Sequence, residues 1–286
     1  MQYVYLNGEF LAPDAAKVSV FDRGFVFADG VYEVIPAYGG RLFRLAQHLE
    51  RLEQSLDGIR LQNPLSAAAW GAVFERLLAQ FGNADQYVYL QITRGAAPRD
   101  HAFPAGIAPT VFAFAKRIDY PSASLVEQGV TAVTLPDIRW SRCDIKSIAL
   151  LPNVLMRQQA VDGGAVEAIL LREGCVTEGA ASNVFVVYRK QLLTPPKGPY
   201  ILPGITRDLV VELARASAVD FAERPIAEAE LRGAEEVWMT SSTKEILPIV
   251  RIDGRPVGSG RPGALHARLF AAYQDYKVRF RAGQTE

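Results

Sequence analysis

Cysteine and histidine are scarce in this sequence, and their scarcity limits the kinds of site that it can carry. The 286 residues include two cysteines, Cys143 and Cys175, too few for a framework of disulfides or for a cysteine-based metal site. The three histidines, His48, His101 and His266, do not have the spacing of metal ligands. We therefore expect no structural metal.

A net charge and a long apolar run are also missing. Basic and acidic residues number 31 each, so the charge favours neither nucleic acid nor an anionic membrane as a partner. No apolar stretch is long enough to span a bilayer. Glu9, Asp14 and Lys17 lie where a signal peptide has its apolar block, so we expect a cytoplasmic protein. The length and the 49% apolar content suit one large or two medium globular domains.

The first half of the chain predicts two hairpins, two helices and two further strands. "YVYLNGEFL" has an Asn-Gly turn between apolar residues, and "GVYEVIPAYGGRLFR" has a Gly-Gly turn. Residues 44–59 predict an amphipathic helix because leucines recur at every third or fourth position. A second helix, opened by Ser66, is expected within residues 65–82, and strands within 86–95 and 109–118.

The second half alternates strands and helices after a polar segment, residues 119–129, which we interpret as a linker. Residues 173–181 have the composition of a turn. The pattern predicts an α+β fold with an N-terminal domain at 1–118 and a C-terminal domain at 130–286, each a sheet or barrel-like sheet with packed helices. Strands are expected at 130–135, 166–172, 182–189 and 235–242, and helices at 151–164, 206–217 and 262–280.

Lys146 stands ahead of an apolar run with no acidic residue following it in "KSIALLPNVLM". A buried ammonium without a partner is costly, so burial favours the neutral amine, which is a nucleophile. The same residues also fit a lysine at a helix start whose charged end reaches water. The rest of the sequence has to separate these interpretations.

Three further features of the second half could bind one anionic, aromatic ligand. Glu178, in "VTEGAASNVF", is either a solvated turn residue or an acid for a ring nitrogen. Residues 204–206 lead into an amphipathic helix, whose N-terminus offers free N–H groups to a phosphate, although Thr206 can also simply cap the helix. The hydroxyls of residues 240–243 can bind a phosphate, and they are also common in ordinary turns. Together with Lys146, these features fit pyridoxal phosphate, which needs a lysine, an acid and phosphate donors.

Five motifs, in order, resemble the signatures of the fold-type IV pyridoxal phosphate enzymes, the class IV aminotransferase family. They are "DRGFVFADGVYEV", "CDIKSIALLPNVL", "VTEGAASNVF", "ILPGITRD" and "MTSSTKEILPI". The resemblance runs from about Tyr3 to the final helix. It implies a two-domain fold with pyridoxal 5'-phosphate held by the C-terminal domain.

The resemblance also implies a role for each matching residue. Lys146 forms the Schiff base with the cofactor and moves the proton at the substrate, and Glu178 pairs with the pyridine nitrogen. Arg51, which could otherwise be a surface charge on its helix, contacts the phosphate. The remaining cofactor contacts are the ring packing of Leu202 and the phosphate donors Ile205, Thr206, Ser241 and Ser242.

The stretch "QITRGAAPRDHAFP" resembles the D-amino acid aminotransferase pattern, in which an arginine and a histidine flank one residue. The resemblance implies that Arg99 and His101, with Tyr32, grip the substrate α-carboxylate; taken alone, the stretch also fits a solvated loop. In the family this loop reaches its own and the neighbouring subunit's site, so a homodimer is implied. We therefore expect transamination of D-amino acids, of the D-alanine type, with an α-keto acid such as 2-oxoglutarate.

One departure and several alternatives remain. Related bacterial enzymes often have "EGSSSN" where this chain has "EGAASN", so Ala180 and Ala181 lack two hydroxyls and predict an altered polarity. The same fold supports a branched-chain L-aminotransferase, an (R)-selective amine transaminase and an aminodeoxychorismate-type lyase. A cofactor-binding protein without turnover is a further alternative.

Overall fold

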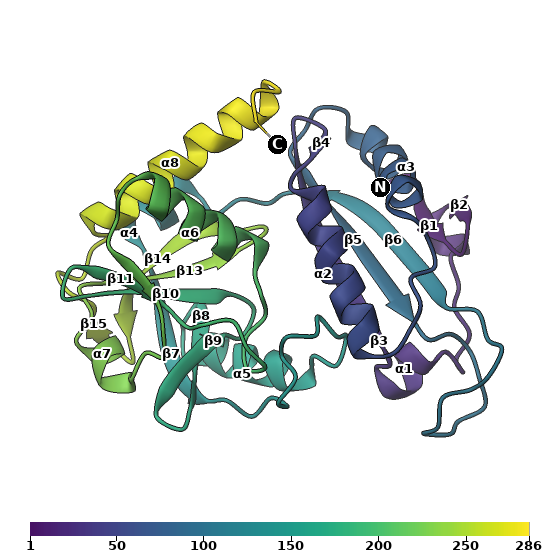
Figure 1. Ribbon diagram of the computed structural model, residues 1–286, viewed down its shortest axis with the longest axis horizontal. Coiled ribbons are helices and arrows are strands. Elements are labelled where there is room, and N and C mark those ends of the chain that lie inside the picture. The colour runs from purple at the N-terminus through teal and green to yellow at the C-terminus, as the bar shows by residue number, and fades with distance from the viewer. Residues whose placement is uncertain (286) are drawn as a thin grey trace. The chain divides into compact units, whose positions relative to one another are not determined.

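The computed structural model describes residues 1–285 and divides the chain into two compact units (Figure 1). The first unit comprises Met1–Asp119, Ile145–Leu150 and Phe280–Glu286, and the second comprises Tyr120–Asp144 and Leu151–Arg279. The expected domains were 1–118 and 130–286, but Ile145–Leu150 and Phe280–Glu286 cluster with the first unit. The expected linker, residues 119–129, contains helix α4 (Ala123–Gln128), which Ser122 caps through Leu125 N. The domain boundaries drawn from the sequence stay a prediction.

The first unit contains a six-stranded antiparallel sheet that includes both predicted hairpins. Asn7 and Gly8 turn the first hairpin with φ of 49° and 100°, and Gly39 and Gly40 turn the second with φ of 60° and 78°. These left-handed angles suit asparagine and glycine. The strand order is β2 (Glu9–Leu11), β1 (Val4–Leu6), β6 (Thr110–Arg117), β5 (Gln86–Thr93), β3 (Gly30–Tyr38) and β4 (Arg41–Leu42).

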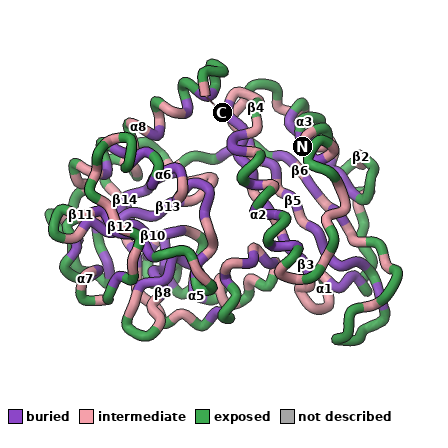
Figure 2. The backbone as a smooth tube through the Cα atoms, in the orientation of Figure 1, coloured by how far each residue is buried: buried purple, intermediate pink, exposed green. Residues whose placement is uncertain are grey.

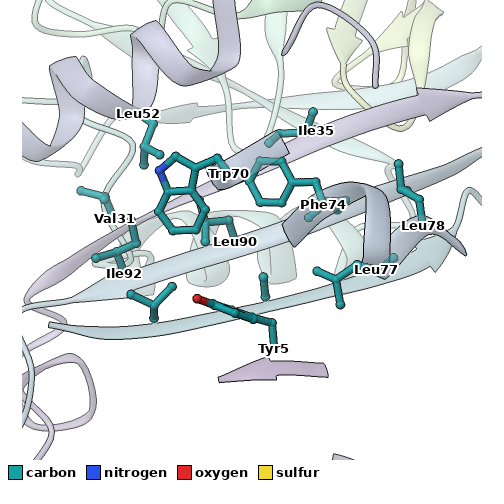
Figure 3. Close-up of a cluster of buried hydrophobic side chains, with 14 of the residues drawn as sticks. Tyr5, Val31, Ile35, Leu52, Trp70, Phe74, Leu77, Leu78, Leu90 and Ile92 are labelled. Atoms are coloured by element: carbon teal, nitrogen blue, oxygen red, sulfur yellow. The ribbon is translucent and has the colours of Figure 1, made fainter. Parts of the chain in front are cut away.

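Helices α2 (Leu45–Gly58) and α3 (Ala67–Leu78) supply apolar side chains to the core of the first unit. Both were expected from leucine spacing and from Ser66, whose Oγ accepts a hydrogen bond from Ala69 N at 3.3 Å. Trp70 and Phe74 stack at 5.6 Å between their ring centroids in this core (Figure 3). The unit also contains α1 (Arg23–Phe27), η1 (Pro13–Ala15) and η2 (Ala79–Phe81).

The second unit is built on a nine-stranded mixed sheet, which confirms the α+β class with two sheets. Its parallel pairs are β11–β12, β14–β7 and β7–β8. Strands β10 and β13 are buried along most of their length (Figure 2). The order is β12 (Phe221–Glu223), β11 (Gln191–Thr194), β10 (Asn183–Tyr188), β13 (Glu236–Ser241), β14 (Glu245–Ile252), β7 (Val130–Pro136), β8 (Glu167–Arg172) and β9 (Cys175–Gly179), with β15 (Arg255–Pro256) on β14.

The interpretation of residues 173–181 as a turn is wrong for most of that segment. Cys175–Gly179 forms strand β9, antiparallel to β8, and only Glu173 and Gly174 make the turn between them. The β-branched Val176 and Thr177 favour a strand, and the acid at 178 is tolerated because its carboxylate has buried partners. Strands β11, β12 and β14 were not predicted either.

The expected helices of the second unit are present as α5 (Leu151–Asp162), α6 (Ile205–Ala216) and α8 (Ala264–Arg281), and α7 (Glu228–Arg232) is additional. Helix α6 buries Leu209, Val210 and Leu213, as its amphipathic pattern predicts. Within residues 1–285, no helix combines the length and the apolar character that a membrane crossing requires.

Candidate active site

Lys146 belongs to the first unit, where its backbone is fastened to strand β3 and to helix α2. Its N–H donates to Ser55 Oγ at 3.1 Å, and its carbonyl accepts from Tyr32 N at 3.0 Å. A bridge between Val31 and Ser147 continues this pairing. The lysine therefore does not start a helix, because α5 begins five residues later, and its side chain is half-buried.

Tyr32 is the neighbour of the lysine side chain. Lys146 Nζ lies 4.1 Å from the centroid of the Tyr32 ring, and Tyr32 stacks on Tyr89 at 5.8 Å. Burial, with Tyr32 adding to it, raises the pKa of Tyr89 to about 12, so its hydroxyl stays protonated and donates to Gln91 Oε1. The side chain of Lys146 therefore lies beside a pair of stacked aromatic rings.

Arg51 is buried rather than a surface charge on its helix. It pairs with Glu33 through two contacts of 2.8 Å, Nε to Oε1 and Nη2 to Oε2, and His48 Nδ1 lies 2.8 Å from Glu33 Oε2. Burial alone would raise the pKa of Glu33, but the charge of Arg51 and hydrogen bonds from Arg51 and His48 hold it well below its usual range. The carboxylate therefore fixes the plane of the guanidinium.

Glu178 lies in β9 of the second unit and is 5% exposed, which excludes a solvated turn residue. Its Oε1 contacts Arg139 Nη1, and its Oε2 accepts from Asn183 Nδ2 at 3.0 Å and from Leu202 N at 3.1 Å. Burial raises the pKa of Glu178 to about 7 despite the nearby Arg139 charge. A cation brought to this carboxylate would therefore be stabilised by it.

The sequence did not reveal Asp137 and Arg139, which support Glu178 from the segment that follows β7. Arg139 donates to both oxygens of Asp137 at 2.9 Å, and Thr177 Oγ1 donates to Asp137 Oδ2 at 3.0 Å. Arg139 thus shares its charge between two acids. The Asp-x-Arg spacing is a signal for such a pair, although it does not identify the second acid.

Asn183 links Glu178 to the segment before helix α6. Its Nδ2 also donates to Leu202 O at 2.9 Å, so one amide holds both the acid and the loop. Gly204 allows this approach, because a Cβ there would lie 1.9 Å from Asn183 Oδ1. Ile205 and Thr206 are buried in the first turn of α6, and Gly204, not Thr206, is the N-cap.

The N-terminus of α6 and the turn after β13 offer donors in the second unit. Among residues 1–285, no side chain caps the N-terminus of α6. The half-buried Ser241 accepts from Lys244 N at 3.2 Å and is followed by Ser242. Thr240 Oγ1 is buried and has no hydrogen-bond partner in the described part of the chain. The uncapped amides and the unpaired hydroxyl can donate to a phosphate, and the carboxylate of Glu178 can accept from a protonated pyridine nitrogen, so these groups fit a phosphorylated pyridine.

Arg99 and His101 are exposed in the loop between β5 and β6. The Arg99 guanidinium lies 5.0 Å from the centroid of the Phe27 ring, and the His101 ring lies 5.2 Å from it. Within residues 1–285, neither side chain makes a hydrogen bond or ring contact with Tyr32. One chain therefore brings together two of the three residues that the sequence assigned to carboxylate binding.

Comparisons with known proteins agree on the family. The family described as amino-transferase class IV matches residues 30–252. The chain is 41% identical over 272 residues to a D-alanine aminotransferase of Bacillus licheniformis, with 95% of this chain and 96% of that protein covered. It is 42% identical over 277 residues to a D-alanine aminotransferase of Staphylococcus epidermidis, with 96% and 98% covered.

Similar solved structures include branched-chain amino acid aminotransferases. The Escherichia coli enzyme superposes with a TM-score of 0.90 at 28% identity, covering 100% of this chain and 96% of its own. A second such enzyme, complexed with N-(5'-phosphopyridoxyl)-L-glutamate, gives 0.89 at 25% identity, with 99% and 94% covered. The enzyme of Thermoproteus uzoniensis gives 0.88 at 30% identity, with 100% and 96% covered. The motifs, the two sheets and these similarities together show that the chain belongs to the class IV aminotransferase family.

Proposed function

We propose that this protein transfers the amino group of D-amino acids, of the D-alanine type, to an α-keto acid such as 2-oxoglutarate, with pyridoxal 5'-phosphate as cofactor. Full-length similarity to D-alanine aminotransferases supports the substrate class. The observation that carries the proposal is the Arg99–His101 pair on one ring, Phe27, because it presents two donors suited to a carboxylate.

When bound, pyridoxal phosphate accepts the electron pair that the substrate α-carbon releases. We assign to Lys146 the covalent bond to the cofactor aldehyde and, once freed, the transfer of the α-proton through Nζ. Glu178 pairs with the pyridine nitrogen, and its pKa of about 7 supports this role because a nearby cation would favour the ionised carboxylate.

We assign phosphate binding to donors from both units. In the second unit these are the amides at the start of α6 and the hydroxyls after β13; in the first it is Arg51, whose plane is fixed by Glu33. Leu202 would pack against the cofactor ring. The proposed phosphate ligands are Arg51, Ile205, Thr206, Ser241 and Ser242.

We propose that Tyr32, Arg99 and His101 bind the substrate α-carboxylate in a homodimer. The exposure of Arg99 and His101, and the lack of a hydrogen bond or ring contact between them and Tyr32 within residues 1–285, support a site that a second copy completes. Large apolar side chains exposed on the single chain, such as Phe25 at 77% and Leu151 at 68%, also support a partner. A cytoplasmic location and the altered polarity at Ala180 and Ala181 stay predictions.

A second candidate is the branched-chain L-aminotransferase, which the structural similarity favours. Fold similarity alone does not fix the substrate. A substrate panel separates the candidates: purified protein with cofactor is mixed with 2-oxoglutarate and D-alanine, L-leucine or an (R)-arylamine. Pyruvate from D-alanine supports the proposal, and turnover restricted to leucine or to the arylamine would overturn it.

Replacement of the lysine tests the site itself. Lys146→Ala should abolish turnover and prevent sodium borohydride from fixing the cofactor to the chain. Lys116→Ala, which removes an exposed lysine paired with Asp119, is the matched control and should behave like the wild type. Normal turnover by Lys146→Ala would refute the assignment.

A further inference from the structure

The loop between β5 and β6, which carries Arg99 and His101, is held from beneath by one buried arginine. Arg23, in α1, is 4% exposed. Its Nη1 donates to Asp100 O and, at 3.4 Å, to Ala102 O, and its Nη2 donates to His101 O at 3.5 Å. A single guanidinium therefore contacts the carbonyls of three consecutive loop residues.

A second arginine, Arg94, binds the same acid, Asp29, that binds Arg23. Asp29 Oδ2 accepts from Arg23 Nε and from Arg94 Nε, each at 2.8 Å, and Asp29 Oδ1 accepts from Arg94 Nη2 at 3.0 Å. The guanidinium of Arg94 lies 3.7 Å from the centroid of the Phe103 ring, farther along the loop. Burial opposes ionisation, but hydrogen bonds and charge from Arg94 and Arg23 lower the pKa of Asp29, so it stays ionised at neutral pH.

The side chains that this arrangement presents share one ring. Arg23, Arg99 and His101 all lie within 5.2 Å of the centroid of the Phe27 ring. Arg23 donates to the backbone carbonyls of residues 100–102, and Phe27 contacts the side chains of Arg99 and His101. A loop of this length costs conformational entropy to order, and these contacts oppose that cost at the two residues proposed to bind carboxylate.

We propose that Arg23, held by Asp29, is a positioning residue for carboxylate recognition: it orders the loop so that Arg99 and His101 can bind the substrate. This inference rests on the proposed function, since it gives that loop its role. Arg23 itself does not touch the substrate. Its loss should weaken substrate binding and leave the chemical step and cofactor binding nearly intact.

The test is the Arg23→Met variant of the cofactor-loaded protein; Asp29 keeps Arg94 as a partner, so we expect the variant to fold. We expect the KM for D-alanine to rise by about tenfold or more, because small misplacements of positioning groups have large effects, with kcat changed less than about threefold. Amide hydrogen exchange of residues 96–105 should accelerate, and the cofactor absorption spectrum should be unchanged. Arg23→Lys, which keeps the charge, should have a KM between those of the wild type and Arg23→Met.

The matched control is Arg41→Met, which removes an arginine that also donates to a carbonyl, Phe280 O, and stacks on a ring, but far from this loop in sequence. It should alter neither the KM nor the exchange of residues 96–105. An unchanged KM and unchanged exchange in Arg23→Met would overturn the inference. Absence of D-alanine turnover in the wild type would instead refute the proposed function, and the exchange measurement would still report whether Arg23 orders the loop.

Discussion

Two buried glutamates, one in each unit, both have arginine partners, but their pKa values are shifted in opposite directions. Glu33 in the first unit faces Arg51 with both carboxylate oxygens and has His48 as a third contact. Glu178 in the second unit meets Arg139 through one oxygen only, while that arginine gives two hydrogen bonds to Asp137. The pKa of Glu33 lies well below its usual range, whereas burial raises that of Glu178 to about 7.

The difference shows how geometry assigns two roles to one residue type. When one guanidinium contacts both oxygens of a carboxylate, the carboxylate stays ionised, its charge is balanced, and it orients that guanidinium. A carboxylate that shares its arginine with another acid keeps a preference for further positive charge. We therefore regard Glu33 as structural support for Arg51 and Glu178 as the group suited to a protonated ring nitrogen.

The largest effect is expected from Glu33→Gln. The substitution removes the carboxylate charge that Arg51 contacts through two hydrogen bonds, and breaking one partner of a buried ion pair costs about 3–5 kcal/mol. Urea unfolding of the cofactor-free protein measures the loss. Glu230→Gln is the control, since it breaks a similarly bidentate but more exposed pair with Arg224 and should cost less than about 1 kcal/mol. Equal losses would contradict the structural role of Glu33.

Glu178→Gln should act on turnover rather than on folding. The neutral amide cannot stabilise a protonated pyridine nitrogen, so we expect kcat with D-alanine to fall about 10²–10³-fold, as when one charge-stabilising group is removed. Arg139 keeps Asp137 as its partner, so at pH 5, where Glu178 is mostly protonated and Gln resembles it, unfolding of the cofactor-free protein should be little changed. Steady-state kinetics and urea unfolding give the two readings, and near-normal kcat would remove Glu178 from the site.

The pH dependence of stability should differ in sign between the two acids. The folded pKa of Glu178, about 7, exceeds its ordinary value of 4.5, so its contribution is complete below pH 4.5 and is lost as the pH rises through 7. A rise of that size corresponds to about 3 kcal/mol. The contribution of Glu33 is present above pH 4.5 and is lost as the pH falls below it.

The cofactor-free protein and its Glu178→Gln variant provide the measurement. Their difference in unfolding free energy should shift between pH 5 and pH 7, the wild type losing stability relative to the variant as the pH increases. A difference that stays constant over this interval would show that burial does not raise the pKa of Glu178.

Much of the fold was predictable because turns and periodicity are local. The Asn7–Gly8 turn and the leucines of α2 each specify their element within a few residues. Strand β9 was not predictable, because the buried acid within it depends on partners distant in sequence, such as Arg139, 39 residues earlier in the chain, and Leu202. Short strands such as β12 depend on neighbours that the sequence does not identify.

The candidate site shows the same limit. Lys146 and Glu178 stand out through the motifs that surround them, but the partners of the charged groups do not. Glu33 had a readable signal, since it occupies the inward register between Val31 and Ile35, and all three are fully buried. A charge at an inward strand position predicts a buried partner; identifying Arg51 as that partner requires the packing of α2 on β3.

The smallest effect is expected from His48→Asn. Burial lowers the pKa of His48, so at neutral pH the ring is uncharged and donates Nδ1–H to Glu33. Its loss removes one hydrogen bond and leaves the Glu33–Arg51 pair intact, which should cost about 1–2 kcal/mol in unfolding free energy. The kcat/KM for D-alanine should change less than threefold. A loss as large as that of Glu33→Gln would mean that Arg51 is held by the histidine as much as by the acid, and the contrast with Glu178 would then rest on three groups rather than on one matched pair.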